Sequence, residues 1–494
     1  MRSGRKGYWA ALSALLLLVS CGTESLPQSP PAGSSGAAGS ATTGGGGSGG
    51  GDANTSGSTA TLGGAGAGGA GASGGGGSAG TGAASGAAGT STAGNAGEGG
   101  TAGTGGVGTA GGGTAGSSGS GGTSAEAWVG TWSSAQQLTE EANKPPSPGL
   151  TNNTLRQIVR VSIGGQKLRL RFSNEYGSTP VTLNGVHIAS SAGGSAITAA
   201  TSKPLAFAGM SSVTIPAKEI VWSDAVDFAL EPLSKLAVSI HFGATSADIT
   251  GHPGSRTTSY LQAGNAAGNA TLSAPVSTDH WYVLSGIDVM AADDARALVI
   301  LGDSITDGRG TTTNGNDRWP DALAERLKAN TATARVGVLN QGIGGNAILN
   351  AGLGPTAMAR FEADVLKQSG VRYVIVFEGV NDIGDNAAAA DITAAYQQFV
   401  TKARSAGLRI YGATILPFKG HSYYSQAHET ARIAVNTWIR TAGNFDAVID
   451  LDAAVRSPQA MDTLLSNYDS GDHLHLNPTG YKQLASAVDL QLFQ

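Results

Sequence analysis

Cysteine is nearly absent from this chain, since Cys21 is the only one in 494 residues. No disulfide can form within the chain, so any folded part depends on its apolar core. Charge is also scarce: Asp, Glu, Lys and Arg make up 13% of the residues and the formal net charge is -5. Without a basic stripe, the composition argues against nucleic acid as a partner.

A long hydrophobic run is also missing from the N-terminus. The apolar stretch from Tyr8 to Val19 is too short to span a bilayer. It follows the positive residues Arg2, Arg5 and Lys6 and is followed by small residues. This is the layout of a secretory signal peptide, which we place at residues 1–20.

The end of this segment, Leu18-Val19-Ser20-Cys21, resembles a bacterial lipobox, whose cysteine becomes the lipidated first residue of the mature protein. The alternative is an ordinary signal peptide followed by an incidental cysteine. The lone Cys21 stands at the matching position, which favours a membrane anchor on this residue. In a host with two membranes, Gly22 resembles an outer-membrane sorting residue. We therefore expect an exported lipoprotein of the cell envelope, at the outer membrane or the cell surface.

Residues 22–126 have no apolar periodicity. Gly, Ala, Ser and Thr alternate through this segment, which contains more than half of the 77 glycines. Such a sequence cannot bury enough apolar surface to offset its chain entropy. We interpret it as a disordered tether with a root-mean-square span of roughly 50–60 Å.

Residues 127–291 consist of short alternating runs separated by turn residues, such as "LRQIVRVSIGGQKLRLRFSNEYG". Gly164-Gly165 predicts a hairpin between two runs, and Asn184-Gly185 predicts a second one more weakly. We expect a β-rich module, either a small sandwich or a jelly-roll. Its tryptophans fit a core better than a sugar-stacking platform, although both remain open for Trp128, Trp132, Trp222 and Trp281.

Residues 292–494 follow a strand, loop, helix rhythm. Apolar runs recur at 297–302, 335–340, 371–378, 408–416 and 447–451, each followed by helical spacing. Trp319, Leu323 and Leu327 mark one helix, and Asn477 with Pro478 marks the start of the last. Five strands alternating with helices predict an α/β domain with a parallel sheet covered on both faces.

Polar motifs follow these predicted strands, at the sheet edge where open α/β sheets bind ligands. The motifs are "GDSIT" with Ser304, "NQGIGGN" with Gly345, "EGVNDIG" with Asn381, and "DHLHLNPTGY" with Asp472 and His475. A hydroxyl, amide donors, an acid and a histidine are the groups that acyl transfer requires.

These four stretches resemble the four blocks of the SGNH, or GDSL-type, serine hydrolases, in the right order, over roughly 296–494. The upstream β-rich region is similar to the one that precedes the catalytic domain in a bacterial branch of that family. The resemblance implies a flavodoxin-like three-layer sandwich with a five-stranded parallel sheet. It also implies esterase or acylhydrolase activity without a metal or organic cofactor.

Carried over to this sequence, the resemblance implies that Ser304 is the nucleophile, His475 the general base and Asp472 the acid that orients it. It places the oxyanion hole at the backbone N–H groups of Ser304 and Gly345 and the side-chain amide of Asn381.

Several neighbouring residues leave alternatives. His473 also follows Asp472, but the family spacing favours His475, and a metal site at "DHLH" is disfavoured because no second ligand cluster is present. We interpret Asp303, Glu378 and Asp382 as support for the loops. His421 fits a loop residue better than a substrate contact.

The sequence thus predicts a surface-anchored serine esterase that acts on short-chain or acetyl esters, with acylated extracellular glycans as candidate substrates. A lysophospholipase, thioesterase or acyltransferase of the same fold is the nearest alternative. A glycan-binding surface lipoprotein is the alternative from a different class.

Overall fold

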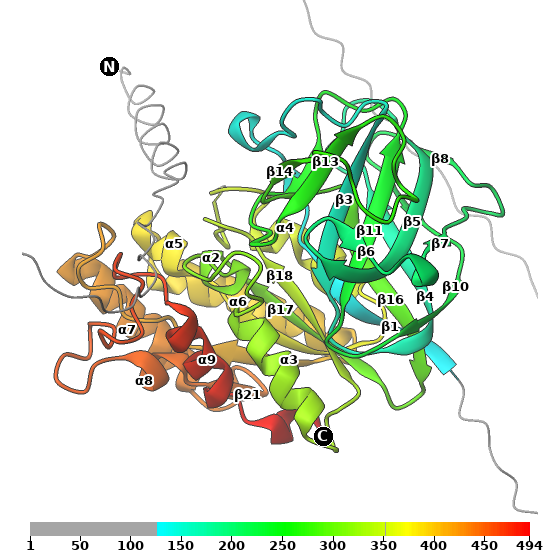
Figure 1. The fold of residues 1–494 in the computed structure, drawn as a ribbon. Helices are drawn as coiled ribbons and strands as arrows, with labels where there is room; N and C mark the ends of the chain where they lie inside the picture. The colour runs from blue at the N-terminus through cyan, green and yellow to red at the C-terminus, as the bar shows by residue number, and fades with distance from the viewer. Residues whose placement is uncertain (1–125, 351) are drawn as a thin grey trace, which may run out of the picture. The chain divides into compact units, whose positions relative to one another are not determined.

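The computed structural model describes residues 126–350 and 352–494 (Figure 1). The predicted signal peptide, the anchor on Cys21 and all but the last residue of the tether lie outside this part of the chain. The described residues all fall within one compact unit. None of their helices is both long and apolar enough to cross a membrane.

The first part of the described chain is antiparallel and contains two large sheets. One sheet has the order β1-β16-β4-β10, with β9 also paired to β4, and the other has the order β14-β13-β3-β11-β5-β6, with β7 and β8 paired to β5. The strands of the first sheet are β1 (Glu126–Ser133), β4 (Gly165–Ser173), β9 (Ile220–Trp222), β10 (Val226–Leu230) and β16 (Leu284–Ala292). Those of the second are β3 (Asn153–Arg160), β5 (Val181–Gly193), β6 (Ala196–Ile197), β7 (Lys203–Pro204), β8 (Val213–Ile215), β11 (Lys235–Phe242), β13 (Ser259–Ala263) and β14 (Val276–Thr278).

A small third sheet joins β2 (Gln137–Leu138), β12 (Thr250–His252) and β15 (Trp281–Tyr282). Single 3-10 turns lie at Glu141–Asn143 and Ala199–Thr201. Trp132 and Trp281 are buried and pack edge to face, with ring centroids 5.0 Å apart. Trp128 and Trp222 are half-buried and enclose the guanidinium of Arg169, at 4.6 and 4.3 Å from the ring centroids.

Both hairpins predicted for this region are wrong. The strands on either side of Gly164-Gly165 belong to different sheets, because β3 pairs with β11 and β13 whereas β4 pairs with β10 and β16. Asn184-Gly185 lies inside β5, where the register against β11 shifts between His241 and Phe242, so the pair forms a bulge. Glycine permits both a sheet-to-sheet crossing and a bulge, so local turn signals did not distinguish these from hairpins.

The second part of the chain contains a five-stranded parallel sheet, as predicted. Its order is β18-β17-β19-β20-β21. The first of these five strands along the chain, β17, therefore lies second in the sheet. The second strand, β18, is added on one side of β17, and the later strands are added on the other side. This 2-1-3-4-5 order is that of flavodoxin-like folds. The bounds are β17 (Arg296–Gly302), β18 (Val336–Gly342), β19 (Val371–Phe377), β20 (Arg409–Ala413) and β21 (Ala447–Ile449).

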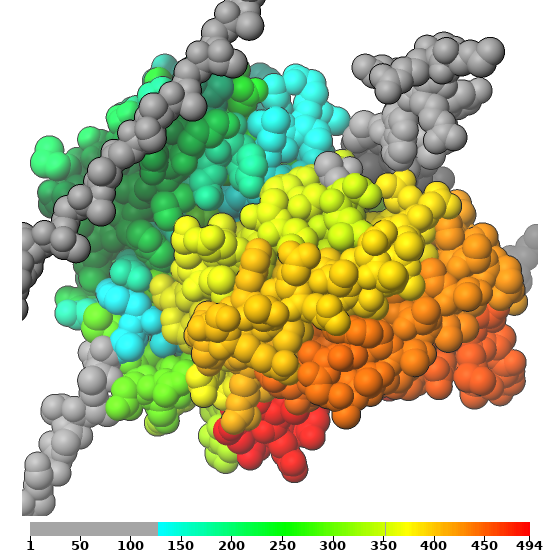
Figure 2. Space-filling view, turned by 180° about the vertical axis from the view of Figure 1, so that it is seen from behind, coloured from blue at the N-terminus to red at the C-terminus, as the bar shows by residue number. Residues whose placement is uncertain are grey.

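Helices cover both faces of the parallel sheet. In Figure 1, α3 and α9 lie side by side on one face, and the rear view in Figure 2 shows α6 (yellow) against α7 (orange) on the other. Their bounds are α2 (Ser304–Asp307), α3 (Trp319–Ala329), α4 (Ala357–Phe361), α5 (Val380–Gly384), α6 (Ala389–Ser405), α7 (Gln426–Arg440), α8 (Leu451–Val455) and α9 (Pro478–Ala487), with a π-turn at Glu362–Leu366 and a 3-10 turn at Leu490–Phe493. The predicted start of the last helix is confirmed, since the side chain of Asn477 accepts from the backbone N–H of Gly480.

The two parts of the chain meet along β18, the edge strand of the parallel sheet. Gly130 of β1 packs on Leu339, and its own carbonyl lies beside Gly337, where a Cβ would come within 2.3 Å of it. The Ser162 hydroxyl accepts a hydrogen bond from the backbone N–H of Val338 at 2.9 Å. One continuous hydrophobic cluster includes residues of both parts. The division into domains at 291 and 292 stays a prediction, because β16 and β17 follow each other within this shared core.

Candidate active site

The segment after β17 fixes Ser304 at the carboxyl edge of the sheet. The Asp303 carboxylate accepts from the backbone N–H of Ile305 at 2.9 Å and so caps the short helix α2 that begins at Ser304. Gly302 allows this tight reversal, because a Cβ there would lie 2.2 Å from the Thr306 hydroxyl. The strand therefore ends in a constrained turn that presents a serine.

The structure brings the three predicted triad residues into one hydrogen-bonded chain. The Ser304 hydroxyl lies 2.8 Å from Nε2 of His475, and Nδ1 of His475 lies 2.6 Å from Oδ2 of Asp472. The serine and histidine are buried, with 7% and 6% of their surfaces exposed. With Nδ1–H donating to the carboxylate, Nε2 is the free acceptor that faces the hydroxyl.

Backbone contacts fix the acid, and the neighbouring histidine lies elsewhere. Oδ1 of Asp472 accepts from the backbone N–H groups of His475 at 2.8 Å and Leu474 at 3.1 Å. The ring of His473 instead pairs with Asp469, with Nδ1 2.6 Å from Oδ2, and about half of its side chain is exposed. Of the two histidines that follow Asp472, only His475 reaches Ser304.

The electrostatics of this chain favour a neutral imidazole beside an ionised carboxylate. Burial lowers the pKa of His475 below the ordinary imidazole value, and the hydrogen bond and charge of Asp472 oppose this effect without reversing it. Burial raises the pKa of Asp472, but the hydrogen bond and charge of His475 outweigh it and the net pKa falls well below its usual range. The histidine is thus able to accept a proton near neutral pH.

Two of the predicted oxyanion donors are backbone N–H groups that make no hydrogen bond within the described residues, those of Ser304 and Gly345. The third is the Asn381 side chain, whose Nδ2 donates to the carbonyl of Asn346 at 2.7 Å and retains one further N–H. That bond ties the start of α5 to the residue next to Gly345. These donors remain available to a developing negative charge.

The acids beside these loops make structural hydrogen bonds. Asp382 accepts from the backbone N–H groups of Ile348 and Leu349, both at 2.9 Å, and so fixes the loop after Gly345. Burial raises the pKa of Asp303 to about 7, and burial together with the Asp303 charge raises that of Glu378 well above its ordinary value.

Arg360 was not singled out in the sequence, and it connects the ends of three strands. This buried guanidinium donates to the carbonyls of Gly302 at 3.0 Å and Gln341 at 2.6 Å, and to Glu378 at 3.2 Å. The sequence offered one signal: Arg360 stands directly before Phe361, at a position where the helical spacing of this segment would place an apolar residue. Such a residue organises the edge of the sheet without touching the Ser304 hydroxyl.

Tyr423 was also missed, and it lies against the oxyanion side of the site. Its hydroxyl donates to Oδ1 of Asn381 at 3.2 Å, opposite the amide nitrogen that binds Asn346. His421 packs edge to face on the Tyr423 ring, with centroids 4.6 Å apart, and is half-buried. Both side chains come from the segment after β20, where the sequence offered only a loop.

A third set of missed residues comes from the antiparallel part. Nε2 of His252, at the end of β12, lies 2.9 Å from Oδ1 of Asp307, which is the last residue of the helix that begins with Ser304. Nδ1 of His252 lies 2.8 Å from the carbonyl of Ala135. Both ring nitrogens thus face oxygen atoms, and the ring connects the antiparallel part of the chain to the helix that begins with Ser304.

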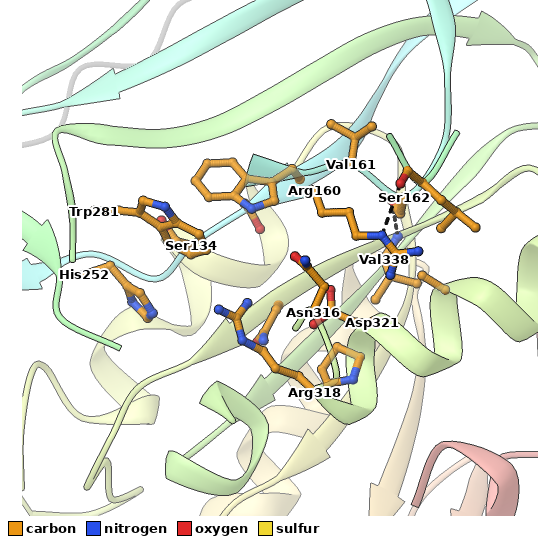
Figure 3. A pocket seen from close by; sticks show the side chains of 16 residues that line it. Ser134, Arg160, Val161, Ser162, His252, Trp281, Asn316, Arg318, Asp321 and Val338 are labelled. Carbon is orange, nitrogen blue, oxygen red and sulfur yellow. Dashed lines mark hydrogen bonds between the residues drawn. The ribbon is translucent and has the colours of Figure 1, made fainter. Parts of the chain in front are cut away.

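His252 also borders a cavity of about 40 Å³ where the antiparallel and α/β parts meet (Figure 3). Trp281 and Ser134 of the first part face Arg318 and Asp321 of the second. The volume is too small for a sugar or an acyl chain, since it exceeds that needed by a single water only about threefold. This cavity therefore belongs to the junction and is not a substrate pocket.

No group of three or more His, Cys, Asp or Glu side chains within residues 126–350 and 352–494 is arranged to hold a metal ion. His473 and His475 turn toward different carboxylates, Asp469 and Asp472. The chemistry that this geometry supports is carried by the serine, histidine and aspartate.

A flavodoxin-like sheet with a serine, a histidine and an aspartate hydrogen-bonded at its carboxyl edge defines the class of this part of the chain as a serine hydrolase-like α/β domain. Residues 300–483 match the GDSL-like Lipase/Acylhydrolase family. The C-terminal part of the chain is therefore a GDSL-type, or SGNH-type, domain, and the four motifs all lie within it.

Solved structures similar to this chain include a lipolytic protein of the G-D-S-L family from Desulfitobacterium hafniense, at 21% identity, over 39% of this chain and 96% of that one, with a TM-score of 0.31. An acetylxylan esterase from Geobacillus stearothermophilus is 22% identical over 39% of this chain and 91% of that one, also with a TM-score of 0.31. A comparison with curated proteins found no match.

Proposed function

We propose that the protein is a serine esterase that hydrolyses carboxylic esters through Ser304, His475 and Asp472. The observation that carries this proposal is the continuous hydrogen-bonded chain from the Ser304 hydroxyl through His475 to Asp472, at 2.8 and 2.6 Å. The family of residues 300–483 consists of lipases and acylhydrolases, which supports ester chemistry at this site.

The reaction proceeds in two acyl-transfer steps. The Ser304 oxygen attacks the ester carbonyl carbon while its proton passes to Nε2 of His475. The imidazolium then gives that proton to the leaving alcohol oxygen, and an acyl-enzyme ester remains on Ser304. Water repeats the attack with His475 as the base, which releases the acid and restores the serine.

The oxyanion is stabilised by the backbone N–H groups of Ser304 and Gly345 and by the Asn381 amide. Among the described residues, no hydrogen-bond partner takes the backbone N–H of Ser304, the backbone N–H of Gly345 or the second amide hydrogen of Asn381. Because these dipoles are fixed in advance, they stabilise charge that forms only in the transition state. Removing one such donor costs roughly 100- to 1000-fold in kcat.

We further propose that the enzyme is exported and anchored to the cell envelope through Cys21, and that it deacylates extracellular glycans with short-chain or acetyl esters. The support is the sequence layout of residues 1–126. An anchor followed by a flexible chain would allow the catalytic part to reach substrates at some distance from the membrane.

The test is hydrolysis of p-nitrophenyl esters, from acetate to longer chains, by residues 124–494. Ser304→Ala is the inactivating variant, and Ser486→Ala, which removes a serine exposed on α9, is the matched control. A fluorophosphonate probe followed by intact-mass measurement reports whether Ser304 is nucleophilic.

We expect turnover and a single adduct in the unmodified and Ser486→Ala proteins, and neither in Ser304→Ala. An adduct without turnover would show that Ser304 is nucleophilic and that these p-nitrophenyl esters are not substrates. Folded protein that gives neither signal would reject the esterase and favour the glycan-binding alternative. Palmitate labelling of the full-length chain that persists in Cys21→Ser would reject the proposed anchor.

A further inference from the structure

Two arginine side chains beside the triad make no hydrogen bond within the described residues. Nε of Arg256 is buried without a partner, and its Nη2 lies 3.6 Å from Oδ2 of Asp307. Nε of Arg309 lies 3.9 Å from Oδ2 of Asp472, and 44% of its side chain is exposed. A guanidinium has five N–H donors, so both arginines retain donors for a ligand.

The antiparallel part of the chain supplies Arg256 on an anchored loop. The loop starts at His252, whose ring is bonded to Asp307 and to the Ala135 carbonyl. Gly254 passes directly over Asp307, since a Cβ there would come within 1.7 Å of its carboxylate oxygen. The loop is therefore held against the helix that carries Ser304.

The backbone of Arg256 has an unusual conformation for its residue type. Its φ is +49°, in the left-handed region that a residue with a Cβ seldom adopts. The Arg256 carbonyl accepts from the backbone N–H of Asn314 at 2.9 Å, which helps to hold this conformation. Backbone strain of this kind concentrates at functional sites, where the surrounding structure maintains it.

Two hydrogen bonds hold the backbone of Arg309 in place. Its backbone N–H donates to the Ser304 carbonyl at 2.9 Å, and its own carbonyl accepts from the hydroxyl of the buried Tyr481 at 2.5 Å. The side chain then extends beside Asp472. Both arginines lie close enough to the triad that their charges lower the pKa of His475.

The acids next to these arginines are already paired with histidines. Asp472 binds His475 at 2.6 Å and Asp307 binds His252 at 2.9 Å. Each carboxylate therefore has a histidine as its hydrogen-bond partner, while the nearest atom of its arginine lies farther away, at 3.6 Å for Arg256 and 3.9 Å for Arg309. In the proposed reaction His475 protonates the leaving alcohol, so the unused donors of two arginines beside His475 would be on the alcohol side of a bound ester.

We propose that Arg256 and Arg309 form a subsite for a carboxylate on the alcohol portion of the substrate, so that the enzyme favours esters of acidic alcohols, including carboxylate-bearing glycans. The inference rests on the proposed esterase function. It assigns a role to the antiparallel part, which contributes one of the two arginines to the active site.

The experiment compares two acetate esters that differ in one charge, 4-acetoxybenzoate and 4-acetoxybenzamide. The full-length protein is assayed for release of each phenol, and the ratio of the two kcat/KM values is the readout. Assays at about pH 8 keep His475 neutral in every variant, since an ordinary imidazole titrates at about 6.5. The variants are Arg256→Gln, Arg309→Gln and the charge-conserving Arg256→Lys. The control is Arg335→Gln, an exposed arginine next to β18 at the opposite end of the sheet.

A charge-assisted contact at a partly exposed site is worth roughly a factor of ten. We expect each glutamine variant to lower the benzoate-to-benzamide ratio about tenfold, Arg256→Lys to lower it less, and Arg335→Gln to leave it unchanged. Added salt should lower the ratio in the unmodified protein, because it screens exposed charges.

Two results would overturn the subsite while leaving the esterase intact. One is hydrolysis of both esters with a ratio that neither glutamine variant changes. The other is an equal loss for both esters in Arg256→Gln, which would assign the loop a structural role alone. If neither ester is hydrolysed and Ser304 takes no fluorophosphonate, the proposed function fails and the subsite fails with it.

Discussion

At the scale of single residues, Tyr423 orients the side chain of Asn381, which the proposed mechanism uses as an oxyanion donor. Its hydroxyl fixes Oδ1 of Asn381 at 3.2 Å while the carbonyl of Asn346 holds Nδ2 at 2.7 Å, so the amide has one orientation. Tyr423→Phe removes one hydrogen bond worth about 1 kcal/mol. We expect kcat to fall roughly fivefold with little change in KM, because the bond acts on the transition state.

The matched control is Tyr424→Phe, which removes the hydroxyl of the next tyrosine, 3.0 Å from Asp462 at the surface. It should leave kcat unchanged. In an Asn381→Ala background, Tyr423→Phe should cause no further loss, because the amide that it orients is gone. A full additional loss in that background would show that Tyr423 acts through something other than Asn381.

The pKa of His475 predicts how kcat/KM depends on pH. In the proposed mechanism His475 acts as a base in its neutral form, and burial lowers its pKa, so the neutral form persists to lower pH than in free imidazole. The acid limb of kcat/KM should therefore have its midpoint below about 6.5. Asp472→Asn should reduce kcat by roughly 10⁴-fold and move the midpoint further down, since the carboxylate that raised the pKa is lost. A midpoint above neutral pH would contradict this assignment.

At the scale of elements, β12 and α2 are linked by the buried pair of His252 and Asp307. Burial raises the pKa of Asp307, but the charge and hydrogen bond of His252, with Arg256 and Arg318, lower it below the ordinary value. A depressed carboxylate pKa stabilises the fold above the unfolded value of about 3.9 and loses this contribution as the pH falls through the folded value.

His252→Ala should therefore be costly at neutral pH, because it leaves Asp307 buried without its partner. We expect the free energy of unfolding, measured by denaturant titration, to fall by roughly 3 kcal/mol or more. Adding Asp307→Asn should restore part of this loss, because the buried charge is then removed. Breaking the exposed pair of Arg335 and Asp294 with Arg335→Gln should cost no more than about 1 kcal/mol. Equal losses in the two single variants would refute a buried ionic link.

The parallel sheet and its motifs were predictable because their signals are local. Each apolar run has its polar motif directly behind it, and the carboxyl ends of parallel strands meet at one edge whatever the details of packing. Ser304 and His475, 171 residues apart, are thus brought together by topology alone. The start of α9 was likewise predictable from two adjacent residues, Asn477 and Pro478.

The contribution of the antiparallel part was not predictable, because it depends on contacts between segments with no shared pattern. His252 is the last residue of a short strand and precedes Pro253 and Gly254, a sequence typical of an ordinary turn. Its partner Asp307 lies 55 residues away, on a helix of four residues. The wrong hairpin at Gly164-Gly165 has the same origin, since a turn signal does not say which sheet the next strand joins.

At the scale of the whole molecule, the antiparallel part completes the edge of the parallel sheet. Leu339 of β18 is buried against Gly130, and the Ser162 hydroxyl binds the backbone N–H of Val338. Without these residues, the β18 edge would expose apolar surface and unpaired backbone groups, which favour aggregation.

Residues 292–494 expressed alone should consequently be poorly soluble or unfold at a lower temperature than residues 124–494. The measurement is soluble yield together with thermal unfolding, and esterase activity for any soluble fraction. Ser162→Ala in the longer chain tests the polar contacts separately, since it removes the hydroxyl's bonds to Val338 and to the Thr131 carbonyl and leaves the apolar contact. It should cost roughly 1–3 kcal/mol. A stable 292–494 fragment with undiminished activity and the same ranking of esters would show that the antiparallel part serves neither the fold nor the site. A stable fragment that ranks the esters differently would instead assign the antiparallel part a role in substrate selection, because the fragment lacks the loop at residues 252–256.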